Sequence, residues 1–158
     1  MSLEIGAIAP DFSLYDSDKN FVSLAYFKGQ NVLLLFFPFA YTSVCTRELC
    51  EIRDNIAFYN DARASVIGIS VDSLYSLARY KVEQNLNFLL LSDFNKEVST
   101  LYDTLYETFG YNMKGVSKRS AFLIDKEGKI LYSEILENAS EVPSFVNINQ
   151  KLAILNVK

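Results

Sequence analysis

The sequence predicts an α/β protein in which a central mixed β-sheet is flanked by helices and preceded by an N-terminal β-hairpin. Two observations support this prediction: apolar runs of strand length alternate with amphipathic stretches of helix length, and near the C-terminus a hairpin pattern is followed by a helix. Strand–helix alternation is typical of parallel strands, whereas hairpins contribute antiparallel ones. At 158 residues the chain is long enough to bury a sizeable core, so we expect one domain covering residues 1–158.

The first elements are expected to be a hairpin and a buried strand. Residues 12–14 and 22–24 alternate apolar and polar side chains on either side of a polar turn, which predicts the hairpin. Residues 32–37 form the longest apolar run, and a run of this length is typical of a central strand buried on both faces. Pro38 follows this run and ends the strand.

Helices and strands alternate along the rest of the chain. The pattern predicts a helix over residues 42–59, a buried strand over 64–71, a helix over 73–84 capped by Ser73 or Asp72, a short strand over 88–91 and a helix over 96–104. A hairpin with strands at 121–124 and 129–133 follows, and a terminal helix is expected from Glu141 onward with Pro143 in its first turn.

Composition narrows the class of protein. Half of the residues are apolar, which argues against a disordered chain. The net charge of −4 offers no basic surface for nucleic acid, and no apolar run approaches the roughly 20 residues that span a bilayer. The first residues lack both a basic region and an apolar secretory segment. We therefore expect a cytoplasmic protein with neither nucleic acid nor membrane as a partner.

The chain has two cysteines and no histidine. In the cytoplasm a cysteine pair is more often catalytic or metal-binding than a structural disulfide. The absence of histidine excludes histidine-activated nucleophiles, histidine general bases and metal sites that need an imidazole. Two cysteines alone are a poor ligand set, so neither a metal nor another cofactor is expected.

Cys45 is expected in the first turn of a helix, where Thr42 or Ser43 provides a cap. Unpaired backbone N–H groups and the positive end of the helix dipole favour a thiolate at that position. Apolar residues recur from Cys45 onward at intervals of three and four, which places them on the helix face turned to the sheet: Cys45, Leu49, Ile52, Ile56 and Tyr59. The sequence therefore predicts a reactive, partly buried cysteine.

Cys50 lies five residues after Cys45 on the same predicted helix. Five residues of an α-helix correspond to about 140° of rotation and about 7.5 Å of rise, which separates the two Cα atoms by about 8.6 Å. A disulfide requires at most about 7 Å between Cα atoms. The two cysteines can therefore bond only if the first turns of the helix unwind.

The spacing Pro38-x-x-x-Thr42-x-x-Cys45 resembles the active-site motif of the peroxiredoxins, which are thiol peroxidases with a thioredoxin-like fold. Flanking and later segments extend the resemblance from Gly6 to about Leu131 and favour the PrxQ or bacterioferritin-comigratory-protein subgroup. These segments are Cys45-Thr46-x-Glu48-x-Cys50-x-x-Arg53-Asp54, Gly68-Ile69-Ser70-x-Asp72-Ser73, Leu90-Leu91-Ser92-Asp93 and Arg119-Ser120-Ala121-Phe122-Leu123-Ile124-Asp125-x-x-Gly128. The apolar segment Phe39-Ala40-Tyr41 is more similar to the one-cysteine AhpE-type branch.

The resemblance implies that the Cys45 thiolate attacks hydrogen peroxide or an organic hydroperoxide and becomes a sulfenic acid. It assigns roles to five further residues: Thr42 and Arg119 bind the peroxide together with backbone amides near Val44 and Cys45, Pro38 shields the thiol from water, Glu48 orients the arginine, and Cys50 closes an intramolecular disulfide. A thioredoxin-like or glutaredoxin-like protein then reduces the disulfide.

Other interpretations remain open at the level of sequence. Thr42 is also compatible with a cap alone, Glu48, Arg53 and Arg119 with surface charges, and Cys50 with a spare thiol in a one-cysteine mechanism. Two further functions are a redox sensor and a disulfide oxidoreductase, although the chain lacks the Cys-x-x-Cys motif that favours the latter. The aromatic cluster of residues 106–113 and the segment of residues 39–41 are compatible with core packing, a substrate entrance or a homodimer contact, and a monomer is not excluded.

Overall fold

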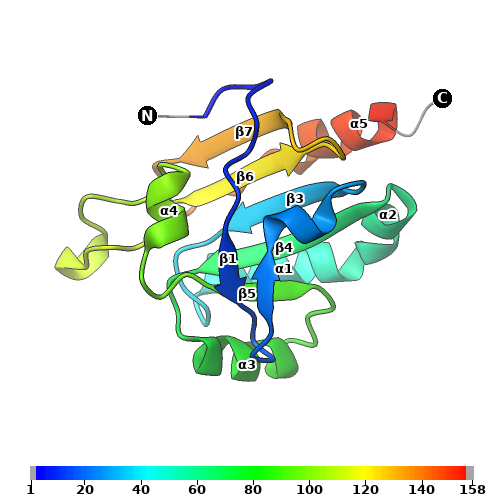
Figure 1. Cartoon of the computed structure of the whole chain (residues 1–158). Coiled ribbons are helices and arrows are strands. Elements are labelled where there is room, and N and C mark those ends of the chain that lie inside the picture. The colour runs from blue at the N-terminus through cyan, green and yellow to red at the C-terminus, as the bar shows by residue number, and fades with distance from the viewer. Residues whose placement is uncertain (1–2, 156–158) are drawn as a thin grey trace.

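Five strands form a mixed sheet in the order β5-β4-β3-β6-β7, and a two-stranded hairpin forms a second, smaller sheet in front of it (Figure 1). The computed structural model describes residues 3–155. The parallel strands are β3 (Asn31–Phe36), β4 (Ala64–Ser70) and β5 (Leu89–Ser92). The antiparallel strands are β6 (Arg119–Ile124) beside β3 and β7 (Ile130–Leu136) at the edge, and the hairpin pairs β1 (Ser13–Tyr15) with β2 (Phe21–Ser23).

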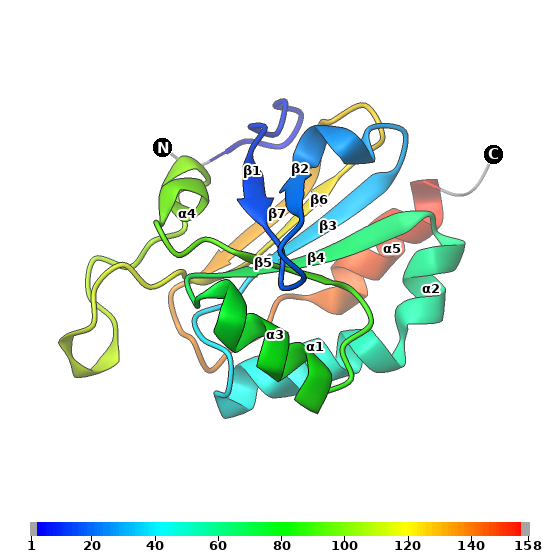
Figure 2. The same ribbon diagram turned by 60° about the horizontal axis from the view of Figure 1, so that its bottom comes forward.

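Helices cover one face of the sheet, and the hairpin with two short helices covers the other (Figure 2). The first face packs against α1 (Ser43–Asp54), α2 (Ile56–Asp61), α3 (Leu74–Glu83) and α5 (Phe145–Leu155). The second face packs against β2, η1 (Leu24–Phe27) and α4 (Glu97–Leu101), and a further short helix, η2 (Gly110–Asn112), lies in the loop before β6. None of the helices between Leu3 and Leu155 has the length and apolarity that crossing a membrane requires.

The central position of β3 follows from its sequence. Every residue of β3 is buried, because neighbouring strands pair with it on both sides and both of its faces are covered. Leu33 and Leu35 point into the core beneath α1 and α3, whereas Leu34 and Phe36 point into the core beneath the hairpin. The prediction of a mixed sheet with a central buried strand and an N-terminal hairpin is confirmed.

The prediction of one helix over residues 42–59 is wrong, because the helix is interrupted at Asn55. Asn55 has φ −114° and ψ 18°, and its side-chain amide donates to the carbonyl of Glu51 at 2.9 Å. Asparagine side chains compete with the backbone in this way and disfavour helix interiors. The buried face nevertheless continues across the break, since Ile52 and Tyr59 both lie in the same core.

Two other helices are shorter than predicted. The helix expected over residues 96–104 covers only Glu97–Leu101, because Lys96 before it and Asp103 after it both adopt left-handed conformations, with φ 61° and 57°. The buried Asp93 carboxylate accepts from the first-turn amides of Val98 and Ser99. The last helix begins at Phe145, so Pro143 precedes it and does not occupy its first turn. Ser73 caps α3, as expected, by accepting from the amide of Ser76.

Candidate active site

Three chain segments meet at the carboxyl end of β3. The chain leaves β3, passes through Pro38 and enters α1 at Ser43. Because β6 runs antiparallel to β3, with Ser120 opposite Phe36, the start of β6 lies at the same edge. The end of β7 also lies there, since Leu136 pairs with Arg119. This topology places Arg119 beside the first turn of α1.

Cys45 is the third residue of α1 and only 1% of its surface is exposed. It packs in the same core as Leu49 and Ile52, as the spacing predicts. The amide of Thr46 makes the first hydrogen bond of the helix, to the carbonyl of Thr42 at 3.0 Å. Cys45 therefore lies in the turn whose amides have no partner within the helix, at the positive end of the dipole.

Arg119 is buried and donates hydrogen bonds to three groups. Its Nη2 donates to Cys45 Sγ at 3.3 Å and to the carbonyl of Ala139 at 2.9 Å, and its Nη1 donates to Glu48 Oε1 at 2.7 Å. Burial lowers the pKa of Arg119, but the charges of Glu48 and Cys45 outweigh this effect and leave the pKa raised. Arg119 is therefore a permanent cation in the site, and the interpretation as a solvated edge charge is wrong.

Glu48 lies one turn after Cys45 and is also buried, so it is not a helix-surface carboxylate. Burial raises the pKa of Glu48 to about 7, although the charge of Arg119 acts in the opposite direction. Within the described part of the chain, Glu48 Oε2 and Arg119 Nε are buried without a hydrogen-bond partner. The two side chains thus meet through a single hydrogen bond and do not form the two-bond fork typical of arginine and a carboxylate.

Thr42 occupies the N-cap position of α1 but does not cap it with its side chain. Its hydroxyl donates to the carbonyl of Phe39 at 2.8 Å, so the interpretation of Thr42 as a side-chain cap is wrong. The residue is exposed beside the start of the helix.

The loop between β3 and α1 is held by buried contacts. Pro38 is buried where the chain leaves β3. Asp72 holds the intervening loop by accepting from the amide of Ala40 at 2.8 Å.

Cys50 is half-buried on a different face of α1, and both cysteines are free thiols. Its thiol donates to Gln84 Oε1 at 3.6 Å, and Arg53 donates to the carbonyl of Gln84 at 2.6 Å. Because α1 is continuous from Ser43 to Asp54, the structure does not bring Cys50 to Cys45. Arg53 is likewise directed toward α3 and Asp54, away from the buried thiol.

Three residues outside the Pro38–Cys45 motif hold the active-site segments in place, and the sequence did not predict these roles. Tyr80 of α3 hydrogen-bonds to Thr46 at 2.8 Å, and Asp72 and Ala139 hold the loop and the arginine. Asp72 belongs to the segment Ser70-x-Asp72 that carries part of the resemblance, so it was detectable. The contribution of Ala139 comes from its carbonyl group, for which the sequence has no signal.

The aromatic cluster of residues 106–113 is divided in the structure. Phe109 packs against Phe39 and Tyr106, with ring centroids 6.1 and 5.1 Å away. Tyr111 is 98% exposed and Met113 is also exposed. Phe39 and its aromatic neighbours therefore form an apolar wall next to the loop that precedes α1.

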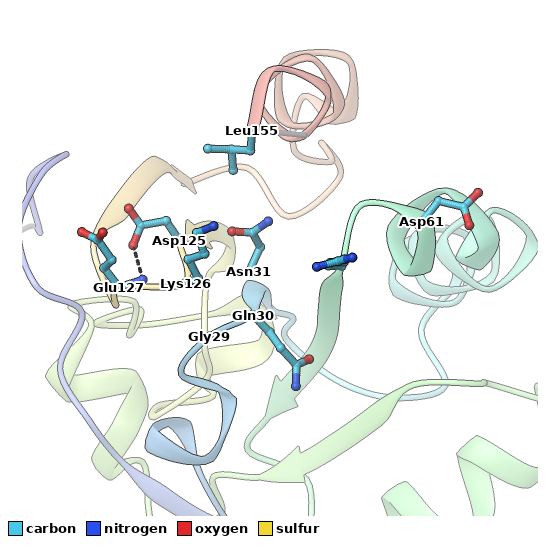
Figure 3. Close-up of a pocket in the computed structure, with 9 residues that line it drawn as sticks. Gly29, Gln30, Asn31, Asp61, Asp125, Lys126, Glu127 and Leu155 are labelled. Atoms are coloured by element: carbon cyan, nitrogen blue, oxygen red, sulfur yellow. Dashed lines mark hydrogen bonds between the residues drawn. The ribbon is translucent and has the colours of Figure 1, made fainter. Parts of the chain in front are cut away.

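A separate polar pocket of about 420 Å³ lies at the opposite end of the sheet, where β3 begins and β6 ends (Figure 3). Its lining includes Asn31, Asp61 and Asp125, whose carboxylate accepts from the amide of Glu127 at 2.9 Å. This pocket contains neither cysteine. Among residues 3–155 no group of three or more acidic or cysteine side chains is arranged to hold a metal ion.

Comparison with known proteins identifies the family. The profile of the AhpC/TSA family matches residues 5–133. The chain belongs to this family. Peroxiredoxin Bcp of Escherichia coli (strain K12) is 42% identical over 130 residues, which cover 81% of this chain and 83% of that protein. Peroxiredoxin Bcp of Bacillus subtilis (strain 168) is 38% identical over 133 residues, or 83% of this chain and 84% of that protein.

Solved structures agree with this assignment. The crystal structure of peroxidoxin BcpB from Mycobacterium tuberculosis matches this AhpC/TSA protein with a TM-score of 0.82 at 27% identity and covers 97% of this chain and 96% of that chain. The thioredoxin-like fold and the resemblance to the PrxQ and bacterioferritin-comigratory-protein subgroup are confirmed. This member of the AhpC/TSA family is a thiol-dependent peroxidase.

Proposed function

We propose that Cys45 is the cysteine oxidised by peroxide and that Arg119 activates it. The observation that supports this most strongly is the 3.3 Å contact between Arg119 Nη2 and Cys45 Sγ, made inside a buried site at the start of a helix. A guanidinium and a helix N-terminus both favour the thiolate, which is the nucleophilic form. The sulfur attacks one peroxide oxygen, the O–O bond breaks, and water or an alcohol leaves.

The groups around Cys45 account for peroxide binding in this proposal. Arg119 and the first amides of α1 donate to the peroxide and to the negative charge that develops on the departing oxygen. The Thr42 hydroxyl donates its hydrogen to Phe39, so its oxygen accepts from the O–H of the peroxide. Pro38, buried beside the loop, limits the access of water, and Glu48 positions Arg119 through its 2.7 Å ion pair.

Cys50 completes the cycle as the resolving cysteine. The Cys45 sulfenic acid condenses with the Cys50 thiol, which forms the disulfide and releases water. A thioredoxin-like or glutaredoxin-like dithiol then reduces the disulfide by thiol–disulfide exchange. We place this cycle in the cytoplasm, where such dithiols are kept reduced.

The loop of residues 39–41 supports two further proposals. Phe39 belongs to the apolar wall with Phe109, and Tyr41 is 54% exposed. This apolar surface suits the entrance for an organic hydroperoxide or a contact in a homodimer. Sedimentation that shows only monomer at high concentration excludes the dimer and leaves the entrance.

Peroxide consumption coupled to NADPH oxidation tests the proposed cycle. Purified protein is supplied with thioredoxin and thioredoxin reductase, or with glutaredoxin and glutathione, and with hydrogen peroxide or an organic hydroperoxide. At least one reductant should sustain many turnovers, and Cys50→Ser should abolish them with that reductant. Equal turnover by Cys50→Ser contradicts the resolving role, and no consumption of any peroxide contradicts the cycle as a whole.

A further inference from the structure

The buried site contains three ionisable groups, of which the single cation can neutralise only one anion. Cys45, Glu48 and Arg119 are each 1% exposed. Arg119 provides a single permanent positive charge, so it balances either a thiolate or a carboxylate. If both acids were ionised, the cluster would hold an uncompensated negative charge away from water, which is strongly unfavourable.

The contacts indicate which acid is the less compensated one. Glu48 meets Arg119 through Oε1 alone, and its other oxygen, Oε2, has no partner in the described part of the chain. Cys45 has both the guanidinium and the start of α1 to stabilise its anion. Glu51, on the same helix, adds a further negative charge that disfavours ionisation of Glu48.

The remaining surroundings of Glu48 contain no second cation in the described structure that contacts it. Arg119, from β6, is the cation that donates to Glu48, while Tyr106 contributes a phenol near Cys45 and Arg119. Burial raises the pKa of Glu48 to about 7, so this carboxyl group exchanges its proton near neutral pH. The negative charge of a neighbouring thiolate favours the protonated form further.

We propose that Cys45 and Glu48 share one dissociable proton, which resides on Glu48 in the reactive thiolate state and leaves Glu48 when the thiolate is consumed. This inference rests on the proposed function of Cys45. Glu48 is thereby a proton-holding residue in addition to a positioning residue for Arg119.

The charges and atoms balance through the reaction. The Cys45 thiolate forms an S–O bond, the O–O bond of the peroxide breaks, and the departing oxygen takes up one proton. Glu48 gives up one proton in the same step. The cluster goes from a thiolate, a carboxylic acid and a guanidinium to a neutral sulfenic acid, a carboxylate and a guanidinium, so its net charge is zero before and after.

Proton counting during oxidation tests this directly. Reduced protein in weak buffer near neutral pH is mixed with one equivalent of peroxide, and a pH-indicator dye reports proton uptake up to formation of the disulfide. Ultraviolet absorbance counts the thiolate in each sample. The wild type should take up almost no proton per thiolate consumed, because Glu48 supplies it. Glu48→Gln should take up about one, as the reaction itself requires. The control Glu127→Gln, which removes an exposed carboxylate at the opposite end of the sheet, should match the wild type.

Infrared difference spectroscopy locates the proton without relying on a variant. The reduced wild type should show a carboxylic-acid carbonyl band that disappears on oxidation and is missing in Glu48→Gln. Uptake of one proton by the wild type, or the absence of this band in the reduced protein, overturns the proposal. Failure to consume peroxide contradicts the proposed function instead, and the band in the reduced protein still reports whether Glu48 is protonated.

Discussion

Arg119 connects the charged groups of the site, because one guanidinium contacts the thiol, the buried carboxyl group and a backbone carbonyl. A lysine has one charged nitrogen and cannot reproduce this planar arrangement of donors. Glu48 and Ala139 fix the direction of the guanidinium and place Nη2 within hydrogen-bond distance of Cys45 Sγ. The effect of Arg119 on the chemistry therefore depends on these two positioning residues.

Replacing Arg119 with alanine should slow the reaction with peroxide. The thiolate loses its adjacent cation, and the departing oxygen loses a donor of a kind that typically contributes about 10²–10³ in rate. The second-order rate constant for oxidation of Cys45, measured by stopped flow, should fall by about this factor. Arg47→Ala, which removes an exposed arginine from the same helix, is the matched control and should retain the wild-type constant. An unchanged constant in Arg119→Ala would remove Arg119 from the active site.

Glu48 should make the stability of the reduced protein depend on pH. Its pKa is raised from 4.5 to about 7, so between these values the folded state binds a proton that the unfolded state lacks. The stabilisation is fully present below pH 4.5 and is lost as pH rises toward 7. The free energy of unfolding should therefore decrease over this range by at most about 1.4 kcal/mol per pH unit. Urea unfolding of wild type and Glu48→Gln checks this, and identical pH dependence in the two proteins contradicts it.

At the scale of residues, sequence was informative where a chemical role needs a particular side chain at a particular spacing. The motif identified Cys45 and Glu48 as neighbours on one helix, and the structure places both in the buried site. Thr42 shows the limit, since its hydroxyl bonds to Phe39 and not to the helix amides. Tyr80 could not be assigned because its partner, Thr46, becomes a neighbour only through the packing of α3 on α1.

At the scale of elements, α1 is attached to α3 and to the residues that follow α3. The Thr46 hydroxyl hydrogen-bonds to the hydroxyl of Tyr80. Cys50 donates a hydrogen bond to the side chain of Gln84, and Arg53 donates one to its backbone carbonyl. These contacts lie along the part of α1 that must unwind if Cys50 is to reach Cys45. The packing of α3 against α1 therefore opposes disulfide formation and keeps the reduced helix intact.

Weakening this attachment should speed disulfide formation. Tyr80→Phe removes the 2.8 Å hydrogen bond to Thr46 and keeps the buried ring. A typical hydrogen bond contributes about 1 kcal/mol, which corresponds to about a fivefold increase in the rate of helix opening. The rate of disulfide formation after a single equivalent of peroxide measures this. Tyr59→Phe, which removes a hydrogen bond to Asn149 on α5, is the control and should leave the rate unchanged. A rate in Tyr80→Phe no faster than in this control contradicts the attachment.

Oxidation should also change amide hydrogen exchange in one part of the chain. Protection of residues 45–53 should fall sharply in the disulfide form, because several helical hydrogen bonds break and buried residues such as Leu49 become exposed. Opening should cost a few kcal/mol, at about 1 kcal/mol per hydrogen bond and 1.5–3 kcal/mol for an exposed leucine or isoleucine. Protection of β3 should stay the same. Equal protection of residues 45–53 in both redox states, with the bond verified by mass spectrometry, contradicts the unwinding.

The spacing of apolar residues predicted which segments are helices and which are strands, but it did not predict where several helices begin or end. The apolar spacing from Cys45 to Tyr59 continues through Asn55, so the interruption there could not be inferred from the buried face alone. The side-chain hydrogen bond of Asn55 to Glu51 is a local competition with the helix that the pattern does not record. The Asp93 carboxylate acts at the other end of a helix, since it accepts from the first-turn amides of Val98 and Ser99, and the apolar pattern does not record this contact either.

At the scale of the whole molecule, strand order creates the site. Arg119 and Cys45 are 74 residues apart in sequence, and they meet because β6 inserts antiparallel beside β3. Alternation of strands and helices predicts a mixed sheet but not which strands are neighbours. Only the resemblance to a family connected Arg119 with Cys45 before the structure was known, since no local pattern carries that information.

In the proposed cycle, the sulfur of Cys45 is the atom that peroxide oxidises. Single-turnover oxidation, followed by trapping with a sulfenic-acid reagent and mass spectrometry, identifies the oxidised sulfur. Cys50→Ser should react once and rapidly with peroxide and carry the trapped sulfenic acid at Cys45, while Cys45→Ser should show neither rapid peroxide consumption nor a disulfide. Normal peroxide consumption by Cys45→Ser, or a trapped sulfenic acid at Cys50 in the wild type with Cys45 unmodified, would contradict the account.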